Sequence, residues 1–187
     1  DENGILKAME TDWSVDHGPY CEFGDLVTTR GSQFIGAGYN IPNIRGEGRT
    51  VATNHAWGSA FRGYGSPQSL FASETLIDML AYQMGEDPLE LRYKNVYREG
   101  DTTPNGCEPD VIALPQALDT IRPIYKEAKA KAEALNAEGG PIKHGVGLSL
   151  NIYGCGLDGP DSAEMWIELT KDGVIVGNSW EDHGQGA

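Results

Sequence analysis

The chain contains 187 residues, of which 39% are hydrophobic and 9% aromatic, so it is long enough for one or two domains with a packed core. Its formal net charge of -14 argues against a nucleic-acid-binding protein, because such surfaces normally carry a basic patch. No apolar run approaches the roughly 20 residues of a bilayer-spanning helix, so we expect neither a nucleic-acid nor a membrane partner.

The first half of the chain contains predicted strands followed by a long predicted helix. Alternating residues indicate a strand over residues 5–15, and a second strand is expected over residues 49–53. Residues 67–84 carry apolar side chains at helical spacing, with Ser66 as the expected N-cap and Gly85 at the position that helix ends prefer.

A second helix is predicted directly after the first. Asp87 is its expected N-cap, Pro88 fits the first helical position, and Glu90 lies three residues after the cap. This helix should run to about Tyr97.

The best candidate for a linker is the segment of residues 100–110, which contains two prolines and two glycines. We therefore predict two domains, residues 1–110 and residues 111–187. The second should begin with an amphipathic helix over residues 114–136, which Pro123 would kink or split.

The last part of the chain reads as β-structure. Alternating apolar residues predict a strand over residues 146–152, and Asp172-Gly173 is typical of the tip of a hairpin between residues 165–170 and 174–179. The loop of residues 153–160 contains three glycines, so a backbone or a ligand is expected close to it. The pattern as a whole predicts an α+β fold with mixed or antiparallel sheets and packed helices.

One glycine-rich segment, residues 60–68, has the composition of an anion-binding turn. Gly63 and Gly65 permit backbone geometry that other residues avoid, and Arg62 precedes a helix N-terminus whose N–H groups favour negative charge. The alternative is a tight turn into a helix with a surface arginine.

A second glycine-rich segment lies at the end of the chain. It consists of His183, Gly184, Gln185 and Gly186, whose backbone N–H groups and glutamine amide suit a large polar cofactor. The alternative is a turn at a strand end.

The sequence lacks the common motifs of nucleophilic, phosphate-binding and zinc-dependent enzymes, and no carboxylate stands out as a tuned acid or base. Cys21, Cys107 and Cys155 are too scattered for a metal or disulfide framework, so we expect no metal ligand among the side chains and reduced thiols in a cytoplasmic protein.

Five motifs together resemble the molybdenum-binding portion of the molybdenum hydroxylase (xanthine oxidase) family along essentially the whole chain. Within that family, the chain is most similar to the aldehyde oxidoreductases of sulfate-reducing bacteria. The motifs, in their order and spacing, are residues 16–20, 38–46, 60–68, 87–92 and 181–186.

The resemblance implies a set of site residues in two adjoining molybdopterin-binding domains. The cofactor would be molybdenum held by molybdopterin cytosine dinucleotide, and its contacts would be Phe61, Arg62, Gly63, His183, Gly184, Gln185 and Gly186. The substrate channel would be lined by Phe23, Leu26 and Tyr64. Phe23 and Leu26 would share a face if they belong to a helical turn.

The resemblance also implies that the reaction is the oxidation of a small aldehyde to a carboxylic acid, with water as the oxygen source. Electrons would pass to two 2Fe-2S clusters and then to an acceptor protein, within a homodimer. Both ends of the chain read as cut, so we expect a piece of a longer polypeptide. The family's iron–sulfur modules would precede the chain and its catalytic glutamate would follow it, so we expect no catalytic residue here.

Three alternatives remain open at this point. A purine or other N-heterocycle hydroxylase of the same family shares the Phe61–Gly65 motif, although Phe23 and Leu26 favour aldehydes. A non-catalytic binding or assembly module is the alternative from another functional class. A plain nucleotide-binding domain is the least favoured, because neither glycine motif follows a strand and opens a helix in the required pattern.

Overall fold

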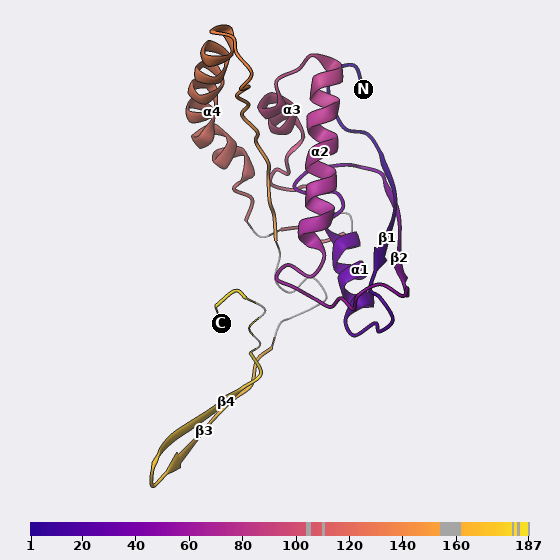
Figure 1. Ribbon diagram of the computed structural model, residues 1–187, viewed down its shortest axis with the longest axis vertical. Helices are drawn as coiled ribbons and strands as arrows, with labels where there is room; N and C mark the ends of the chain where they lie inside the picture. Colours follow the sequence, from indigo (N-terminus) through magenta and orange to yellow (C-terminus); the bar gives the residue numbers. More distant parts are fainter. Residues whose placement is uncertain (104–105, 110, 154–161, 181, 183, 187) are drawn as a thin grey trace.

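A computed structural model describes residues 1–103, 106–109, 111–153, 162–180, 182 and 184–186 of the chain. Its elements follow one another in the order β1 (Met9–Asp16), α1 (Gly24–Gln33), β2 (Ile44–Val51), α2 (Ser66–Met84), α3 (Pro88–Asn95), α4 (Leu114–Ala137), β3 (Met165–Thr170) and β4 (Gly173–Asn178). The strands pair into one parallel and one antiparallel two-stranded sheet. This confirms the predicted α+β class (Figure 1).

Strands β1 and β2 are parallel, with Met9 opposite Ile44 at the start of the register. Parallel neighbours need a crossover connection, and α1 provides it. The indole of Trp13 packs between helix and sheet: a Cβ atom at Gly31 of α1 would lie 2.2 Å from the ring, and one at Gly48 of β2 would lie 2.8 Å from it. The two glycines therefore allow the helix to lie close to the sheet.

The limits of these elements differ from the prediction. The first strand begins at Met9, later than expected, and the second begins at Ile44, earlier than expected. The sequence indicated no more than a helical turn around Phe23 and Leu26, where the structure has helix α1. The described part of the chain therefore has three helices before residue 110, and two were predicted.

The two following helices largely confirm the sequence prediction at their ends. Helix α2 ends at Gly85 in a left-handed conformation, with φ of 67°. Asp87 caps α3 as predicted, accepting hydrogen bonds from the N–H groups of Leu89 and Glu90 over 2.9 and 3.4 Å, although this helix ends at Asn95 and not at Tyr97. The predicted Ser66 cap was wrong: Gly65 is the N-cap residue of α2, and the Ser66 hydroxyl donates to the Gly63 carbonyl in the first turn.

Helix α4 continues through Pro123 as a single element of 24 residues. Of the two outcomes that Pro123 left open, the split is therefore excluded. Among the described residues, no helix combines the length and the apolar composition that a bilayer crossing requires.

The main hydrophobic core lies where α2, α3 and α4 meet. Its fully buried side chains come from all three helices and the residues just after α3: Ala81, Leu89, Leu91, Val96 and Leu118. Tyr39 and Leu150, from the segments after α1 and α4, also belong to it.

The segment of residues 146–152 is extended but pairs with no other strand among the described residues, so the predicted strand was wrong. Its alternation nevertheless reflects packing, because Leu148 and Leu150 contact the core. A Cβ atom at Gly38 would lie 3.3 Å from Ile152, which places this side chain beside the core as well.

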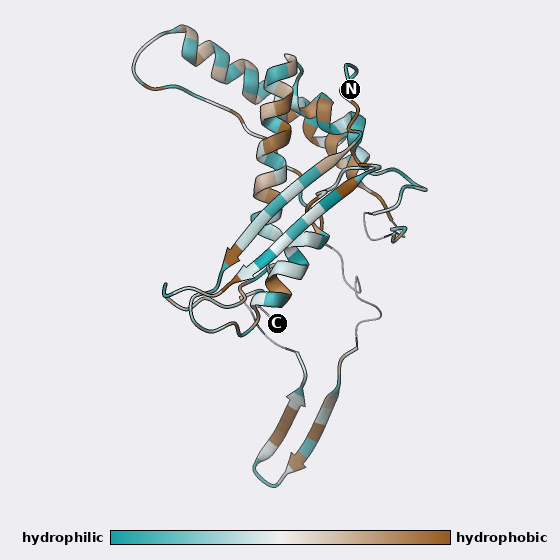
Figure 2. Cartoon of the chain, turned by 90° about the vertical axis from the view of Figure 1, so that its right-hand side faces the viewer, coloured by the Kyte–Doolittle hydropathy of each residue, from teal (hydrophilic) through white to brown (hydrophobic). Residues whose placement is uncertain are grey.

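The predicted hairpin is confirmed as β3 and β4, which project from the helical body (Figures 1 and 2). Thr170 lies opposite Gly173, so Lys171 and Asp172 form the turn, one residue before the predicted Asp172-Gly173 tip. Both strands carry exposed apolar side chains: Met165, Trp166, Ile167, Leu169, Val174, Ile175 and Val176. In the loop that was expected to approach a ligand, residues 154–160 lie outside the described part of the chain.

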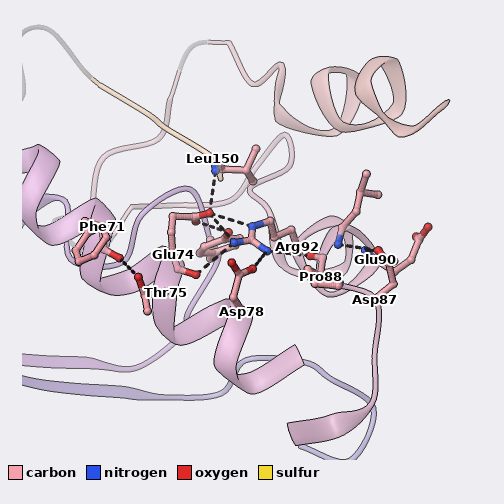
Figure 3. Close-up of polar contacts among 11 residues, drawn as sticks. Phe71, Glu74, Thr75, Asp78, Asp87, Pro88, Glu90, Arg92 and Leu150 are labelled. Atoms are coloured by element: carbon pink, nitrogen blue, oxygen red, sulfur yellow. Dashed lines mark hydrogen bonds and ion pairs between the residues drawn. The ribbon is translucent and has the colours of Figure 1, made fainter. Parts of the chain in front are cut away.

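A buried polar cluster connects the helices to the extended segment (Figure 3). Glu74 of α2 accepts from the Arg92 guanidinium of α3 over 2.9 Å and from the backbone N–H of Leu150 over 2.8 Å. Arg92 also donates to Asp78 over 2.7 Å. One carboxylate thus links three segments that are far apart in sequence.

Candidate cofactor and substrate site

The turn before α2 places three consecutive residues at positive φ: Gly63 at 95°, Tyr64 at 47° and Gly65 at 96°. A Cβ atom at Gly65 would lie 2.2 Å from the carbonyl oxygen of Val27, and one at Gly63 would lie 2.6 Å from Pro67. Both positions therefore require glycine. Tyr64 bears a side chain in a region that non-glycine residues rarely occupy, a feature that concentrates at functional sites.

The turn lies against the start of α1, which brings two of the predicted channel residues together. Phe23 is the N-cap residue of α1, and its ring meets that of Tyr64 edge to face, with centroids 6.2 Å apart and an interplanar angle of 61°. Both side chains are half-buried. Leu26 lies in the first turn of α1 and is 51% exposed, so it presents an apolar side chain at the same end of the helix.

Arg62 and Gly184 meet although they lie far apart in the sequence. A Cβ atom added at Gly184 would lie 3.2 Å from Nη2 of Arg62, and Gly184 has a positive φ of 98°. The two glycine-rich segments that the sequence predicted as cofactor contacts are therefore adjacent in the fold. Phe61, Arg62, Gly184, Gln185 and Gly186 are all exposed, while Gly63 is half-buried. His183 lies outside the described residues.

Asp182 is a residue of this site that the sequence prediction missed. Its Oδ1 accepts hydrogen bonds from the N–H groups of Gly184, over 2.6 Å, and Gly186, over 3.3 Å. The N–H groups of Gly184 and Gly186, which the sequence predicted as donors to a cofactor, therefore bond one negatively charged oxygen of the chain itself. The signal in the sequence was an aspartate two residues before a glycine, the spacing of an Asx turn.

The contact between Arg62 and Gly184 presents hydrogen-bond donors on an exposed surface. An exposed guanidinium beside a glycine without a side chain offers donors and room for phosphate or oxo groups. Among the described residues, no group of three His, Cys, Asp or Glu side chains is arranged to hold a metal ion.

A shallow cavity of ≈ 690 Å³ is lined by Tyr20, Cys21, Glu22 and Trp57, which lie a few residues before Phe23 and Arg62 in the sequence. Another, of ≈ 870 Å³, lies elsewhere, where residues 40–45 face the start of β1. None of the described site residues lines either cavity.

Comparison with known proteins identifies the type of domain. Two models of a molybdopterin cofactor-binding domain match residues 1–96 and residues 120–187. The residues between these matches include the predicted boundary after residue 110, which therefore stays a prediction.

Individual relatives agree with the domain match. The chain is 65% identical over all its 187 residues to an aldehyde oxidoreductase of Megalodesulfovibrio gigas, and it covers 20% of that protein. It is 33% identical over 189 aligned residues to a probable xanthine dehydrogenase component of Bacillus subtilis, covering 25% of that protein. The chain thus spans between a fifth and a quarter of the length of these curated relatives.

Solved structures show the same relationship. All of the chain superposes on 20% of the aldehyde oxidoreductase from Desulfovibrio gigas, with a TM-score of 0.84 and 64% identity. It superposes likewise on 20% of the aldehyde oxidoreductase from Desulfovibrio desulfuricans, with a TM-score of 0.85 and 61% identity. The chain belongs to the molybdopterin cofactor-binding domains of the molybdenum hydroxylase (xanthine oxidase) family.

Proposed function

We propose that this chain lines the cofactor site and the substrate channel of a molybdenum-dependent aldehyde oxidoreductase. The observation that carries the proposal is the meeting of Arg62 with Gly184 next to the turn that holds Tyr64 against Phe23. The fold thus brings a guanidinium and two aromatic rings close to a glycine loop that lies far away in the sequence. The identity of 65% to a protein named aldehyde oxidoreductase supports the choice of reaction.

On the cofactor side, Phe61, Arg62 and Gly63 act with the loop of residues 183–186. When bound, molybdopterin with its molybdenum supplies a two-electron redox centre and a Lewis acid. The Arg62 guanidinium offers five donors in a planar fork, which suits an anionic group. Gly184 leaves space beside that guanidinium because it has no side chain. We propose molybdopterin cytosine dinucleotide as the form of the cofactor.

On the substrate side, Phe23 and Tyr64 form an aromatic wall with Leu26 next to it. Such a wall excludes water and favours a small apolar substrate over a charged one. The Tyr64 hydroxyl adds a polar group that can orient a carbonyl oxygen. These residues therefore bind and orient an aldehyde, and none of them is proposed as the catalytic base.

The remaining features of the reaction are proposed for the longer protein to which the relatives correspond. They are oxidation with water as the oxygen source, a glutamate base outside this chain, and electron transfer without NAD through two 2Fe-2S clusters to an acceptor protein. A homodimer in the cytoplasm belongs to the same proposal.

The relatives named as xanthine dehydrogenases favour a second candidate, a purine or N-heterocycle hydroxylase, at 32–33% identity. Steady-state assays of the intact enzyme with aldehydes and with purines separate the two. We expect turnover of aldehydes; turnover of purines alone would replace the aldehyde assignment by the second candidate.

The cofactor role is tested with Arg62→Ala in the intact enzyme and molybdenum determined by elemental analysis. Loss of charge-assisted hydrogen bonds should weaken cofactor retention by about tenfold or more. A matched control is Arg45→Ala, because Arg45 is also exposed and its contact with Glu10 is a surface ion pair of 3.5 Å on the sheet. Wild-type molybdenum content in Arg62→Ala would refute the role of Arg62, and a wild-type protein without molybdenum would favour a non-catalytic binding module.

A further inference from the structure

Residues 16–18, at the end of β1, bind the loop of residues 52–59 that leads into the Arg62 turn. The Asp16 carboxylate accepts from the backbone N–H of Gly18 over 2.9 Å and from the Thr53 hydroxyl over 2.6 Å. His55 donates Nδ1–H to the other carboxylate oxygen of Asp16. These bonds hold the pKa of Asp16 at about 2, with the Thr53 hydroxyl as the largest cause. The carboxylate is therefore ionised at neutral pH and accepts from three donors.

His17 holds the other end of the same loop. Its side chain is 3% exposed, and Nδ1 lies 3.3 Å from the Gly58 carbonyl oxygen. A carbonyl oxygen only accepts, so Nδ1 carries the proton in this contact. The Gly58 N–H donates back to the His17 carbonyl over 3.3 Å, which makes the connection reciprocal.

Gly18 allows the loop to lie directly on the end of the strand. Its φ is +68°, and a Cβ atom there would lie 2.8 Å from the Ala56 carbonyl and 2.9 Å from the His55 carbonyl. The Thr53 N–H donates to the Gly18 carbonyl over 3.0 Å. Three consecutive residues therefore fix the loop at Thr53, His55 and Gly58.

Beyond Gly58, the chain reaches the Arg62 turn after few residues and is held again on α1 and the loop before it. Ser59 donates its hydroxyl to Glu22 over 2.7 Å, next to Phe23. At the far side of the turn, Gly65 packs on the Val27 carbonyl. The segment that carries Arg62 and Tyr64 is thus attached to the rest of the fold at both of its ends.

We propose that Asp16 and His17 are positioning residues of the cofactor and channel site, which act by holding the loop of residues 52–59 so that Arg62 faces Gly184 and Tyr64 meets Phe23. This inference rests on the proposed function of Arg62 and Tyr64. Asp16 and His17 act through Thr53, His55 and Gly58, and neither is placed in contact with the cofactor.

The test uses two substitutions of Asp16 in the intact enzyme. Asp16→Ala removes the acceptor for all three donors, whereas Asp16→Asn keeps one acceptor oxygen for Thr53 and Gly18. The matched control is Asp12→Ala, on the same strand, because Asp12 is 66% exposed and pairs with Arg49 of β2 and not with the loop.

Hydrogen exchange of the loop is the first readout. In Asp16→Ala, the amides of Thr53 and Gly58 should exchange about tenfold faster. Their carbonyl partners on Gly18 and His17 remain, but the loop opens more often once the Thr53 hydroxyl and His55 lose their charged acceptor. Asp16→Asn should restore part of the protection, and Asp12→Ala should leave it unchanged. Unchanged exchange in Asp16→Ala would overturn the inference.

Molybdenum content and the KM for an aldehyde are the second readout, with Arg62→Ala measured alongside. We expect Asp16→Ala to lower the content and raise the KM severalfold, with partial rescue in Asp16→Asn. If Arg62→Ala loses molybdenum while Asp16→Ala keeps it with a wild-type KM, the positioning role is wrong and the proposed function stands. If Arg62→Ala retains its molybdenum, the proposed cofactor role fails, and the positioning inference that rests on it fails too.

Discussion

The backbone N–H of Leu150 donates a hydrogen bond to Oε2 of Glu74 over 2.8 Å in the protein core. The same carboxylate accepts from Arg92 and from the hydroxyl of Tyr39. Burial, and then the charge of Glu74, raise the pKa of Tyr39 far above its usual value, so this hydroxyl stays protonated and remains a donor. The extended segment after α4 is thus fixed to α2 by a carboxylate whose hydrogen bonds are shared among three elements.

Replacement of Glu74 should be the most damaging single change in this cluster. The Arg92 side chain is 0% exposed, so Glu74→Gln leaves a buried guanidinium whose remaining ion-pair partner, Asp78, is 47% exposed. Breaking one side of a buried ion pair costs about 3 kcal/mol or more of unfolding free energy. Urea titration measures this loss.

Asp78→Asn is the matched control, because it removes the solvent-exposed partner of the same guanidinium over 2.7 Å. Asp78 is 47% exposed and asparagine keeps an acceptor oxygen for the guanidinium, so this variant should lose clearly less stability than Glu74→Gln. Equal destabilisation by the two substitutions would show that burial of Glu74 does not decide the effect.

Asp87 should make the stability of the α3–α4 contact depend on pH. Burial raises the pKa of Asp87, but the Lys129 ammonium at 2.7 Å and the capped N–H groups of α3 outweigh it and hold the pKa below its usual range. A depressed folded-state pKa means that the stabilisation is complete above the unfolded pKa of about 3.9 and is lost as the pH falls below it. The free energy of unfolding should therefore fall in the acid range.

Two variants separate the cap from the ion pair. Asp87→Asn keeps an acceptor for the helix N-terminus and removes the charge, so its difference from wild type should shrink between pH 7 and pH 3. Asp87→Ala should cost a further amount of about 1 kcal/mol at both pH values, because the cap is lost. Denaturant titrations at the two pH values measure both effects; a wild-type-to-Asn difference that does not change with pH contradicts the role of the charge.

Features decided by neighbouring residues were predictable from the sequence. The Asp87-Pro88 start of α3, the glycine end of α2 and the hairpin of β3 and β4 each depend on a few adjacent side chains. Helix α1 gave a weak signal because its buried residues, Gly24, Val27, Thr28 and Gly31, are mostly small and fit beneath Trp13 and His17. Their packing, and not an apolar stripe, makes that helix possible.

Features that depend on distant contacts were not predictable from the residues alone. The alternation in residues 146–152 was correct as a packing pattern, but it cannot tell a paired strand from an extended segment held by Glu74. Family resemblance pointed to Arg62 and Gly184 separately, and only the fold places them together. Whether these residues contact a cofactor stays a prediction.

Gly65 should be the glycine of the Arg62 turn that tolerates substitution least. In Gly65→Ala, a non-glycine residue at φ of 96° costs about 1–3 kcal/mol, and the new Cβ atom would also meet the Val27 carbonyl at 2.2 Å. Gly85→Ala provides the matched control: its φ is also positive, at 67°, but nothing lies within 4 Å of the new atom. Only the backbone strain then remains, so urea titration should show a clearly smaller loss for Gly85→Ala.

Because the clash at Gly65 would also push Tyr64 away from Phe23, the intact Gly65→Ala enzyme should lose aldehyde affinity while Gly85→Ala keeps it. Equal stability losses in the two variants, with equal KM values, would show that the close approach of Gly65 to α1 does not shape the site.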